Sequence, residues 1–351
     1  MQDKKIPIGI LGATGMVGQR FIQLLEGHPW FEIVWLAASE RSEGKSYAEA
    51  VKWRMRTRIP ERIANMQMSS ADPVNAPKVI FAALDSVPAK ELEPKFAAAG
   101  CAVVTNSSAF RMYPDVPLVV PEVNPDHISI LERQEWRKKS GGYIVTNPNC
   151  SAIGLVMALA PLHQKFHIQK VFVSTMQAVS GAGYPGVASL DIIGNVIPFI
   201  NGEEPKLEAE TKKLLGTLAP GGIQDAPFGI TAHCNRVPVE DGHTECVSVS
   251  FAKKATESEI LNAWANYIGV PQQLALPSAP PSVLQYDDRP DRPQPRFQVD
   301  AGGGMTATLG RLRPCSLLDW KFVVLSHNTI RGAAGAAILN AELLKAKGYL
   351  S

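Results

Sequence analysis

The first 105 residues alternate between short apolar runs and amphipathic segments, and this pattern predicts the fold of the N-terminal half. Four apolar runs have the length of buried parallel strands: Lys5–Leu11, Phe31–Ala38, Lys78–Ala83 and Ala102–Thr105. Apolar residues at helical spacing lie between them at Gln19–Glu26 and Glu91–Ala99. Strands that alternate with helices predict an α/β fold with a Rossmann-like, doubly wound parallel sheet.

The pattern changes after Asn147. Residues Gln169–Gln177 and Thr244–Phe251 alternate between apolar and polar with period two, which indicates strands with one covered face. A charged helix is expected over Pro205–Leu215, and the Pro-rich segment Pro277–Arg296 is expected to form an ordered or semi-ordered loop. This half is therefore predicted to be an α+β domain with a mixed sheet.

The C-terminal segment His327–Leu350 is Ala-rich and predicted to be helical. We expect it to return to the first domain and pack on it. The chain then divides into a dinucleotide-binding domain at 1–148, completed by residues 328–351, and a second domain at 149–327. No internal repeat is visible, which argues against a solenoid.

Composition narrows the class of protein. The 351 residues are 45% hydrophobic and 19% charged, as in ordinary globular proteins, and a net charge of +2 without a Lys/Arg run gives no nucleic-acid signature. No stretch approaches about 18 consecutive apolar residues, so no membrane span is expected, and the N-terminus lacks the apolar region of a signal peptide. The five cysteines include no CxxC pair, which argues against a disulfide framework or a zinc site. We expect a cytoplasmic enzyme without a metal.

A glycine motif, GATGMVG, follows the first predicted strand and precedes the first predicted helix. In this context glycines let the backbone approach a pyrophosphate, and the helix N-terminus favours its negative charge. The spacing is GxxGxxG rather than GxGxxG. The expected cofactor contacts in this motif are Gly12, Thr14, Gly15, Met16, Val17 and Gly18.

The second predicted strand ends in SERSEGKS, and the residues at this strand end indicate whether the cofactor carries a 2′-hydroxyl or a 2′-phosphate on its ribose. NAD-preferring folds usually place an acidic residue here to bind the 2′-hydroxyl. Ser39, Arg41 and Ser42, with Lys45 nearby, supply hydroxyls and cations that suit a 2′-phosphate. Glu40 is counter-evidence unless it points into solvent. The balance favours NADP.

Cys150 stands where the loop NPN gives way to a run of apolar helix formers. Pro148 disfavours helical backbone in the residue before it, so the helix should begin just after it. A thiol at a helix start lies near unpaired N–H groups and the positive end of the helix dipole, which lowers the pKa of the thiol. The alternative for a lone cysteine is a buried core residue.

Seven segments occur in the order and spacing of aspartate-β-semialdehyde dehydrogenases, and the chain resembles that family over nearly its whole length. They are GATGMVG, SSAFRM, NPNCS, QAVSGAG, GEEPKLEAET, RVPVEDGHTE and SHNTIRGAAG. The cysteine and histidine motifs look closest to the archaeal and fungal branch. The resemblance implies reversible, NADPH-dependent reductive dephosphorylation of L-aspartyl-4-phosphate to the semialdehyde, on the route to lysine, threonine, methionine and isoleucine. It also implies that the second domain is catalytic and forms homodimers or homotetramers.

The resemblance further implies a thioester mechanism in which Cys150 is the nucleophile. His243 would be the general acid and base, since imidazole titrates near neutral pH, and Gln177 would orient the acyl group. Five other histidines are expected to be structural: His28, His127, His163, His167 and His233. The cofactor contacts implied outside the glycine motif are Ser180, Gly181 and, at the nicotinamide end, Asn328.

The charges of such a substrate need partners, and the matching motifs supply them. Arg236 can hold the α-carboxylate with a bidentate fork. Glu203 suits the α-ammonium, although spacing alone does not exclude Glu204. Lys206 and Arg111 suit the phosphate. The implied substrate-binding set is Arg111, Asn149, Glu203, Lys206 and Arg236.

Two alternatives remain at this point: an acyl-CoA reductase, and a cofactor-binding regulatory protein with a dead site. Acyl-CoA reductases such as the archaeal malonyl-CoA reductases share the architecture and many motifs, and N-acetyl-glutamyl-phosphate reductases share the architecture with a different cysteine motif. A cofactor-binding regulatory protein with a dead site would more often have lost one of the residues Cys150, Gln177, Arg236 and His243, which are all present. The segment NGEEPK places an acid and a lysine close together, which favours an amino-acid phosphate over a CoA thioester.

Overall fold

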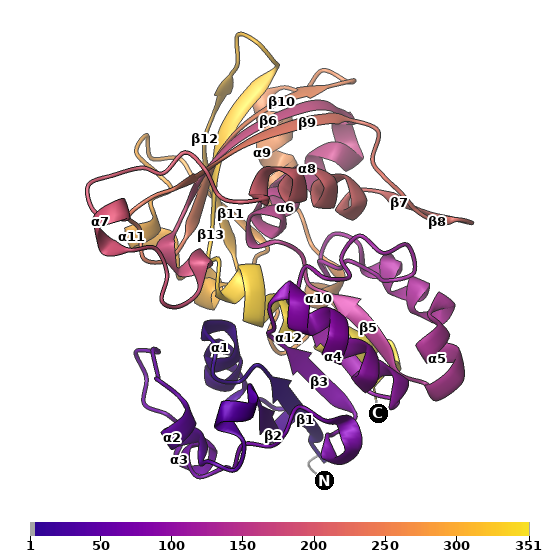
Figure 1. The fold of residues 1–351 in the computed structure, drawn as a ribbon. Coiled ribbons are helices and arrows are strands. Elements are labelled where there is room, and N and C mark those ends of the chain that lie inside the picture. Colours follow the sequence, from indigo (N-terminus) through magenta and orange to yellow (C-terminus); the bar gives the residue numbers. More distant parts are fainter. Residues whose placement is uncertain (1–3, 351) are drawn as a thin grey trace.

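The N-terminal sheet has five parallel strands in the order β2-β1-β3-β4-β5 (Figure 1). The computed structural model describes residues 4–350 of the chain. The strands are β1 (Ile6–Leu11), β2 (Phe31–Ala37), β3 (Val79–Ala82), β4 (Ala102–Thr105) and β5 (Tyr143–Thr146). The predicted doubly wound parallel sheet is confirmed, and in such sheets ligands bind outside the carboxyl ends of the strands, where the strand order reverses.

Helices cover this sheet and connect its strands. They are α1 (Met16–Leu25), α2 (Tyr47–Ala50), α3 (Glu61–Ala64), α4 (Ser86–Ala98) and α5 (Glu135–Ser140), with 3₁₀ turns η1 (Glu40–Ser42), η2 (Pro73–Asn75) and η3 (Pro125–Arg133). Strands β3, β4 and β5 are buried on both faces. This explains why their sequences are continuous apolar runs rather than alternating ones.

The second sheet has six strands in the order β11-β12-β13-β10-β6-β9. They are β6 (Ile168–Gln177), β9 (Gly229–Arg236), β10 (His243–Phe251), β11 (Leu284–Asp287), β12 (Ala307–Pro314) and β13 (Trp320–Ser326); a hairpin, β7 (Thr217–Ala219) and β8 (Gly222–Gln224), stands apart. The β6–β9 and β11–β12 pairs are parallel and the others antiparallel, so the predicted mixed sheet is confirmed. Its helical segments are α6 (Cys150–Phe166), η4 (Val179–Ala182), α7 (Ser189–Ile192), α8 (Glu203–Leu214), α9 (Glu257–Ala265), α10 (Val270–Gln273), α11 (Pro295–Gln298) and η5 (Ala301–Gly304).

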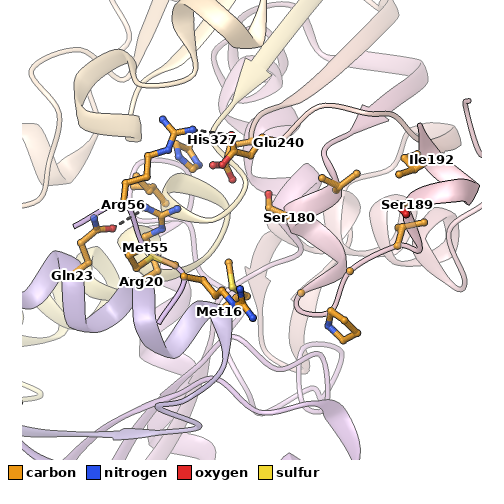
Figure 2. A pocket seen from close by; sticks show the side chains of 18 of the residues that line it. Met16, Arg20, Gln23, Met55, Arg56, Ser180, Ser189, Ile192, Glu240 and His327 are labelled. Carbon is orange, nitrogen blue, oxygen red and sulfur yellow. Dashed lines mark hydrogen bonds and ion pairs between the residues drawn. The ribbon is translucent and has the colours of Figure 1, made fainter. Parts of the chain in front are cut away.

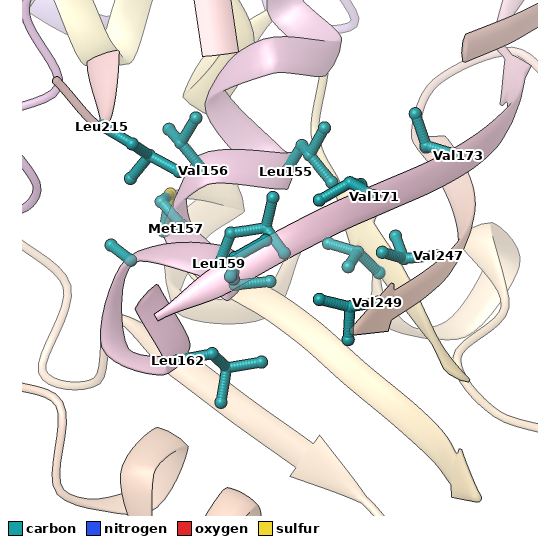
Figure 3. Close-up of a cluster of buried hydrophobic side chains, with 14 of the residues drawn as sticks. Leu155, Val156, Met157, Leu159, Leu162, Val171, Val173, Leu215, Val247 and Val249 are labelled. Atoms are coloured by element: carbon teal, nitrogen blue, oxygen red, sulfur yellow. The ribbon is translucent and has the colours of Figure 1, made fainter. Parts of the chain in front are cut away.

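Helix α6 forms the centre of the second core. Leu155 and Leu159 lie in one buried cluster with Val173 on β6 and Val247 on β10 (Figure 3). Each aliphatic side chain buried in this way contributes about 1.5–3 kcal/mol. Because the helix is apolar almost all round and enclosed by its neighbours, its first residue, Cys150, is held in a defined place.

The C-terminal segment returns to the N-terminal core, as its composition predicts. It begins with a π-helical turn, η6 (Ile330–Ala334), and continues as α12 (Gly335–Ala346). Ile338 and Leu343 join the buried cluster that contains the strands of the first sheet. The buried Glu342 contacts His28 at 2.8 Å, which links the last helix to the loop before β2.

Three local predictions are wrong in detail. Helix α1 begins at Met16 rather than Gln19, because Gly18 lies within the helix and its missing side chain lets the first turn pack on the glycine loop. The C-terminal helix spans residues 330–346 rather than 327–350, and its first turn is the π turn, in which the N–H of Gly332 donates to the carbonyl of His327. The Pro-rich segment expected as a loop contains β11, which pairs with β12. Within residues 4–350, no helix has both the length and the apolar character needed to cross a bilayer.

Candidate active site

The candidate site lies where the carboxyl ends of the N-terminal strands face the second sheet. A cavity of about 380 Å³ opens there between the two halves of the chain. Its lining includes nine of the residues expected at the site: Met16, Val17, Arg111, Asn149, Cys150, Ser180, Gly181, Lys206 and Asn328. Residues far apart in the sequence therefore share one cavity with the nucleophile candidate.

Cys150 is the first residue of α6, and its sulfur lies 3.2 Å from Nε2 of His243. The Oδ1 atom of Asn149 accepts hydrogen bonds from the N–H groups of Ser151 and Ala152. The helix start predicted after Pro148 is confirmed, but the lowered thiol pKa is not. Burial raises the pKa of Cys150 to about 12, with Glu203 acting in the same direction and Arg111 and Arg236 opposing it. Asn149 caps N–H groups that were expected to be free, and desolvation outweighs the nearby cations.

The strand register brings three predicted residues to one edge of the second sheet. Gln177 ends β6 beside Arg236, which ends β9, and His243 begins β10 on the other side of β6. Two residues deeper, Thr175 pairs with both Cys234 and Glu245. Because side chains alternate between faces along a strand, these positions point toward the same side as the three at the edge. The side chains directly beneath the site are thus mostly polar, and the next positions along the strands on this face are apolar: Val173, Ala232 and Val247.

Glu203 points toward the residues around Cys150, whereas Glu204 points toward β9. An oxygen of Glu203 accepts hydrogen bonds from Nδ2 of Asn149 at 2.8 Å and from Nε2 of Gln177 at 3.1 Å. Glu204 instead accepts from the backbone N–H of Cys234 on β9. The choice between the two acids that the sequence left open therefore favours Glu203 on geometry.

Arg111 is buried and held in place by a second carboxylate. Its Nη1 lies 3.0 Å from Glu210, and its Nη2 donates to the carbonyl of Asn106 at 2.6 Å. The other oxygen of Glu210 accepts from the backbone N–H of Asn149 at 2.6 Å. One carboxylate therefore ties the expected phosphate-binding arginine to the residue before the nucleophile. The ammonium of Lys213 donates to the carbonyl of Arg111 and further fixes this loop.

A second cavity of about 570 Å³ continues along the glycine loop. The three glycines of the motif have different local requirements. Gly12 has φ of +88°, and a Cβ on Gly18 would lie 2.3 Å from the carbonyl oxygen of Gly12, so both are needed for the tight turn. A Cβ on Gly15 would meet nothing closer than 3.5 Å, which leaves its backbone open to a ligand. A pyrophosphate fits at such a cradle. The predicted residues that line this cavity are Gly12, Thr14, Gly15, Met16, Val17 and Ser39.

Two residues expected near the ribose are not part of this lining. Arg41 is exposed on η1 and Ser42 is buried beneath it, and neither borders the cavity in the described part of the chain. The lining cations are instead Lys52 and Arg54, and the Arg54 guanidinium lies 4.1 Å from the centre of the Tyr184 ring. Sequence reasoning missed this pair. The signal was the alternation of cations in KWRMRTR, which is not a continuous basic run.

Asn328 bridges two loops of the site. Its Oδ1 accepts from the N–H of Gly242, directly before His243, and its Nδ2 donates to Oγ of Ser180, both at 2.8 Å. The side chain therefore positions the histidine loop against η4. Its expected contact with a nicotinamide stays a prediction.

A third cavity of about 560 Å³ separates α1 from the loop after η4. Arg56 and Glu240 meet at 2.8 Å across it, one from each half of the chain (Figure 2). Both side chains are largely exposed, so the pair contributes about 0–1 kcal/mol. Met16 and Ser180 line this cavity and the one at Cys150, so the two cavities adjoin. Across residues 4–350, no three His, Cys, Asp or Glu side chains gather as a metal site requires.

Comparison with known sequences assigns both halves of the chain. Residues 7–131 match the family described as semialdehyde dehydrogenase, NAD binding domain, and residues 159–331 match semialdehyde dehydrogenase, dimerisation domain. The aspartate-semialdehyde dehydrogenase of Methanothermobacter thermautotrophicus is 49% identical over 97% of this chain and 99% of its own length. That of Schizosaccharomyces pombe is 46% identical over 98% of this chain and 99% of its own length.

Solved structures agree with these sequence matches. An aspartate semialdehyde dehydrogenase with NADP from Candida albicans has a TM-score of 0.91 and 44% identity, covering 98% of this chain and 100% of that chain. An aspartate semialdehyde dehydrogenase II complexed with ASA from Vibrio cholerae has a TM-score of 0.77 and 26% identity, covering 99% of this chain and 100% of that chain. The likeness therefore extends over the two sheets and the segment that joins them.

Proposed function

The chain belongs to the aspartate-semialdehyde dehydrogenase family, and we propose that it catalyses the reversible, NADPH-dependent conversion of L-aspartyl-4-phosphate to L-aspartate-4-semialdehyde and phosphate. The observation that carries this proposal is the 3.2 Å contact between the sulfur of Cys150 and Nε2 of His243, beside a cavity that also presents Arg111 and Lys206. A thiol, an imidazole and two cations are the groups that acyl transfer from a phosphate requires.

Each charge of the proposed substrate has a candidate partner. Lys206 and the preorganised Arg111 suit the phosphate, and Glu203 suits the α-ammonium. Arg236 suits the α-carboxylate: its Nη1 already donates to the carbonyl of Ala178, which orients the guanidinium. These assignments are supported by burial, since Arg111, Glu203 and Arg236 each expose less than a tenth of their surface. A charge that is shielded from water attracts an opposite charge on a bound substrate more strongly than an exposed one does.

The proposed reaction begins with attack of Cys150 on the acyl carbon. Phosphate leaves, and the aspartyl group remains on the sulfur as a thioester. Gln177, held by Glu203 and Thr175, lies beside the reacting group and restricts its orientation. NADPH, when bound, supplies the hydride that reduces the thioester to the aldehyde. The residues proposed to hold it are the glycine loop, Ser39 and the loop of Ser180 and Gly181, with Arg41 and Ser42 proposed to select NADP over NAD.

We further propose that the chain works as a homodimer or homotetramer through its second half. Four apolar side chains in the segment before α8 are exposed, and a second copy would cover them: Leu190, Ile193, Val196 and Phe199. Light scattering after size-exclusion chromatography gives the mass, and a monomer at micromolar concentration would contradict this part of the proposal.

The test is an assay of the purified protein with aspartate semialdehyde, phosphate and NADP, followed through the absorbance of NADPH. We expect turnover that depends on both the aldehyde and phosphate. A parallel assay offers malonyl-CoA with NADPH. Faster reduction of malonyl-CoA than of aspartyl phosphate would keep the family and reject the proposed substrate.

A further inference from the structure

Helix α8 carries four charged residues at spacings of three or four positions, which places them on one face of the helix. They are Glu203, Lys206, Glu210 and Lys213. Lys206 lines the cavity at Cys150, and Glu203 and Glu210 contact residues that line it. Lys213 is buried near the C-terminal end of the helix, and the proposed function gives it no role.

The ammonium of Lys213 binds one loop, Arg111–Val116, through the backbone. Its Nζ donates to the carbonyl of Arg111 at 2.6 Å, to that of Tyr113 at 2.8 Å and to that of Val116 at 3.1 Å. An ammonium has three N–H groups and no acceptor, so these three bonds use all of its hydrogens. Lys213 exposes 5% of its surface, which leaves little room for water to replace these bonds.

The loop Arg111–Val116 has little other restraint at its tip. Met112 and Tyr113 each expose nearly half of their surface. A backbone bond inside the loop, from the N–H of Val116 to the carbonyl of Tyr113, is long at 3.4 Å. Much of the restraint on this backbone therefore comes from Lys213.

Arg111 is consequently held twice by α8. Glu210 binds its guanidinium at 3.0 Å, and Lys213, one helical turn further on, binds its backbone carbonyl. The Nε–H of Arg111 is buried and has no hydrogen-bond partner within residues 4–350. Because Arg111 lines the cavity at Cys150, this N–H is available to an anion bound there.

We propose that Lys213 is a positioning residue for phosphate: its ammonium fixes the loop that presents Arg111, so loss of this charge weakens phosphate binding more than binding of the amino-acid part of the substrate. The inference rests on the proposed function. A neutral amine has only two N–H groups, so one of the three carbonyls would face a lone pair and the loop would have to move. Glu203 and Arg236, proposed to bind the ammonium and carboxylate of the substrate, lie outside the loop.

The surroundings of Lys213 make its charge sensitive to pH. Burial lowers the pKa of Lys213 to about 8. Three acids around it oppose this shift: Asp225, Glu210 and Asp115. His127 on η3 is a further titratable neighbour, and burial lowers its pKa as well. Lys213 therefore loses its proton as the pH rises through about 8, and the KM for phosphate should increase over the same range.

Lys213→Met removes the charge with little change in side-chain length, and Lys212→Met at the half-buried neighbouring position is the matched control. With aspartate semialdehyde, NADP and varied phosphate, we expect Lys213→Met to raise the KM for phosphate about tenfold or more, and to change kcat and the KM for the aldehyde by smaller factors. Lys212→Met should match the wild type. An equal rise in both KM values would overturn the proposal.

A double-mutant cycle shows whether Lys213 acts through Arg111. In the Arg111→Ala background, adding Lys213→Met should change the KM for phosphate by less than about threefold, because residues that act as a unit are not additive. Fully additive effects would mean that Lys213 does not position Arg111, and would overturn the proposal.

The wild type offers a test that requires no variant to fold. Its KM for phosphate should rise between about pH 7.5 and pH 9.5, and that of Lys213→Met should stay constant at the higher value. Glu93 lies near Arg111, and burial raises its pKa to about 8, so it titrates in the same range. A constant KM in the wild type, or a rise that persists in Lys213→Met, would overturn the proposal.

Binding of inorganic phosphate without aldehyde or cofactor separates this inference from the proposed function. In ³¹P NMR at about pH 7.5, we expect the wild type to broaden the phosphate resonance more than Lys213→Met or Arg111→Ala does at the same protein concentration. Equal broadening by the wild type and Lys213→Met, or none by the wild type, would refute the positioning role. Broadening that depends on Lys213, in a protein without aspartate semialdehyde turnover, would refute the proposed function alone.

Discussion

Gly332 lies against Cys150 so closely that a Cβ at residue 332 would be 2.7 Å from the Cβ of Cys150. Gly332 belongs to the π turn, and its neighbour Arg331 forms a bidentate, fully buried ion pair with Glu122. The C-terminal segment therefore contacts Cys150 as well as completing the first core. Single π turns inside helices occur frequently at functional sites. Here the π turn contains Gly332, the residue that contacts Cys150.

Gly332→Ala should leave the protein folded and reduce its activity. The added methyl group must displace the start of α6, and a shift of about 1 Å at a reacting atom can cost about 10² in rate. Gly221→Ala is the matched control, because a Cβ there meets nothing within 4 Å. The measurements are kcat and the thermal midpoint of both variants. Full activity in a folded Gly332→Ala protein would show that the contact does not constrain the sulfur.

Cys150→Ser should fold normally and lose nearly all turnover, since a hydroxyl is a far weaker nucleophile at this position than a thiol. Cys246→Ser is the control, because Cys246 is exposed on β10. Steady-state rates with aspartate semialdehyde, phosphate and NADP provide the test. A Cys150→Ser enzyme with more than about a tenth of the wild-type rate would remove Cys150 from the role of nucleophile.

Glu203→Ala should impair aspartate semialdehyde turnover by about 10² or more, because truncation leaves the substrate ammonium buried without a partner. Glu204→Ala should have a much smaller effect on kcat/KM, since Glu204 contacts a backbone N–H on β9. Succinic semialdehyde, which has no amine, should be a poor substrate for the wild type and lose little further in Glu203→Ala. Equal losses with both aldehydes would mean that Glu203 acts through Asn149 and Gln177 rather than on the ammonium.

Arg41→Ala should raise the KM for NADP and leave that for NAD nearly unchanged, if the cation after β2 binds the 2′-phosphate. Arg54→Ala provides the comparison, because Arg54 lines the cavity along the glycine loop directly. Kinetics with both cofactors distinguish the two residues. Suppose that Arg41→Ala leaves the NADP kinetics unchanged and Arg54→Ala selectively raises the KM for NADP. The 2′-phosphate is then bound by Arg54 and not by Arg41.

Glu245→Gln should make stability less dependent on pH. Burial raises the pKa of Glu245 well above its usual value, and within residues 4–350 neither carboxylate oxygen has a hydrogen-bond partner. Above about pH 4.3 the unfolded chain loses this proton while the folded protein keeps it, so wild-type stability falls by up to about 1.4 kcal/mol per pH unit until the folded pKa is reached. A glutamine does not ionise in either state.

Urea unfolding at about pH 5, 6 and 7 measures this difference. The free energy of unfolding of Glu245→Gln minus that of the wild type should increase with pH across that range. The exposed Glu257→Gln on α9 serves as the control and should follow the wild type. Parallel pH curves for wild type and Glu245→Gln would show that Glu245 is ionised in the folded protein.

Two of the strands that carry site residues could be predicted from the sequence, because β6 and β10 alternate between apolar and polar residues, and Gln177 and His243 stand at their ends. Strand β9 was not predicted, so the position of Arg236 beside Gln177 is known only from the strand register. The choice of Glu203 over Glu204 required the fold, because both begin α8 and only the packing of that helix decides which one faces the site.

Long-range polar contacts and the burial of charged groups could not be predicted from the sequence. The hydrogen bond between Arg111 and Glu210 joins residues 99 positions apart, and no local sequence pattern predicts it. The thiol pKa was expected to fall because a helix start is visible in the sequence, whereas the burial of Cys150 and the capping of its neighbours by Asn149 are not. The π turn was missed for a related reason: it changes hydrogen-bond register without changing the apolar pattern.

The buried C-terminal segment also has a consequence for protein synthesis. The five strands of the first sheet are complete once Thr146 has left the ribosome, yet Ile338 and Leu343, which fill their core, are translated almost last. Domains usually fold as units in the order in which they emerge. Here the nascent nucleotide-binding half has an open apolar face while the entire second sheet is made. The first core and the contact of Gly332 with Cys150 are therefore completed together at a late stage, when the last helix is released and docks.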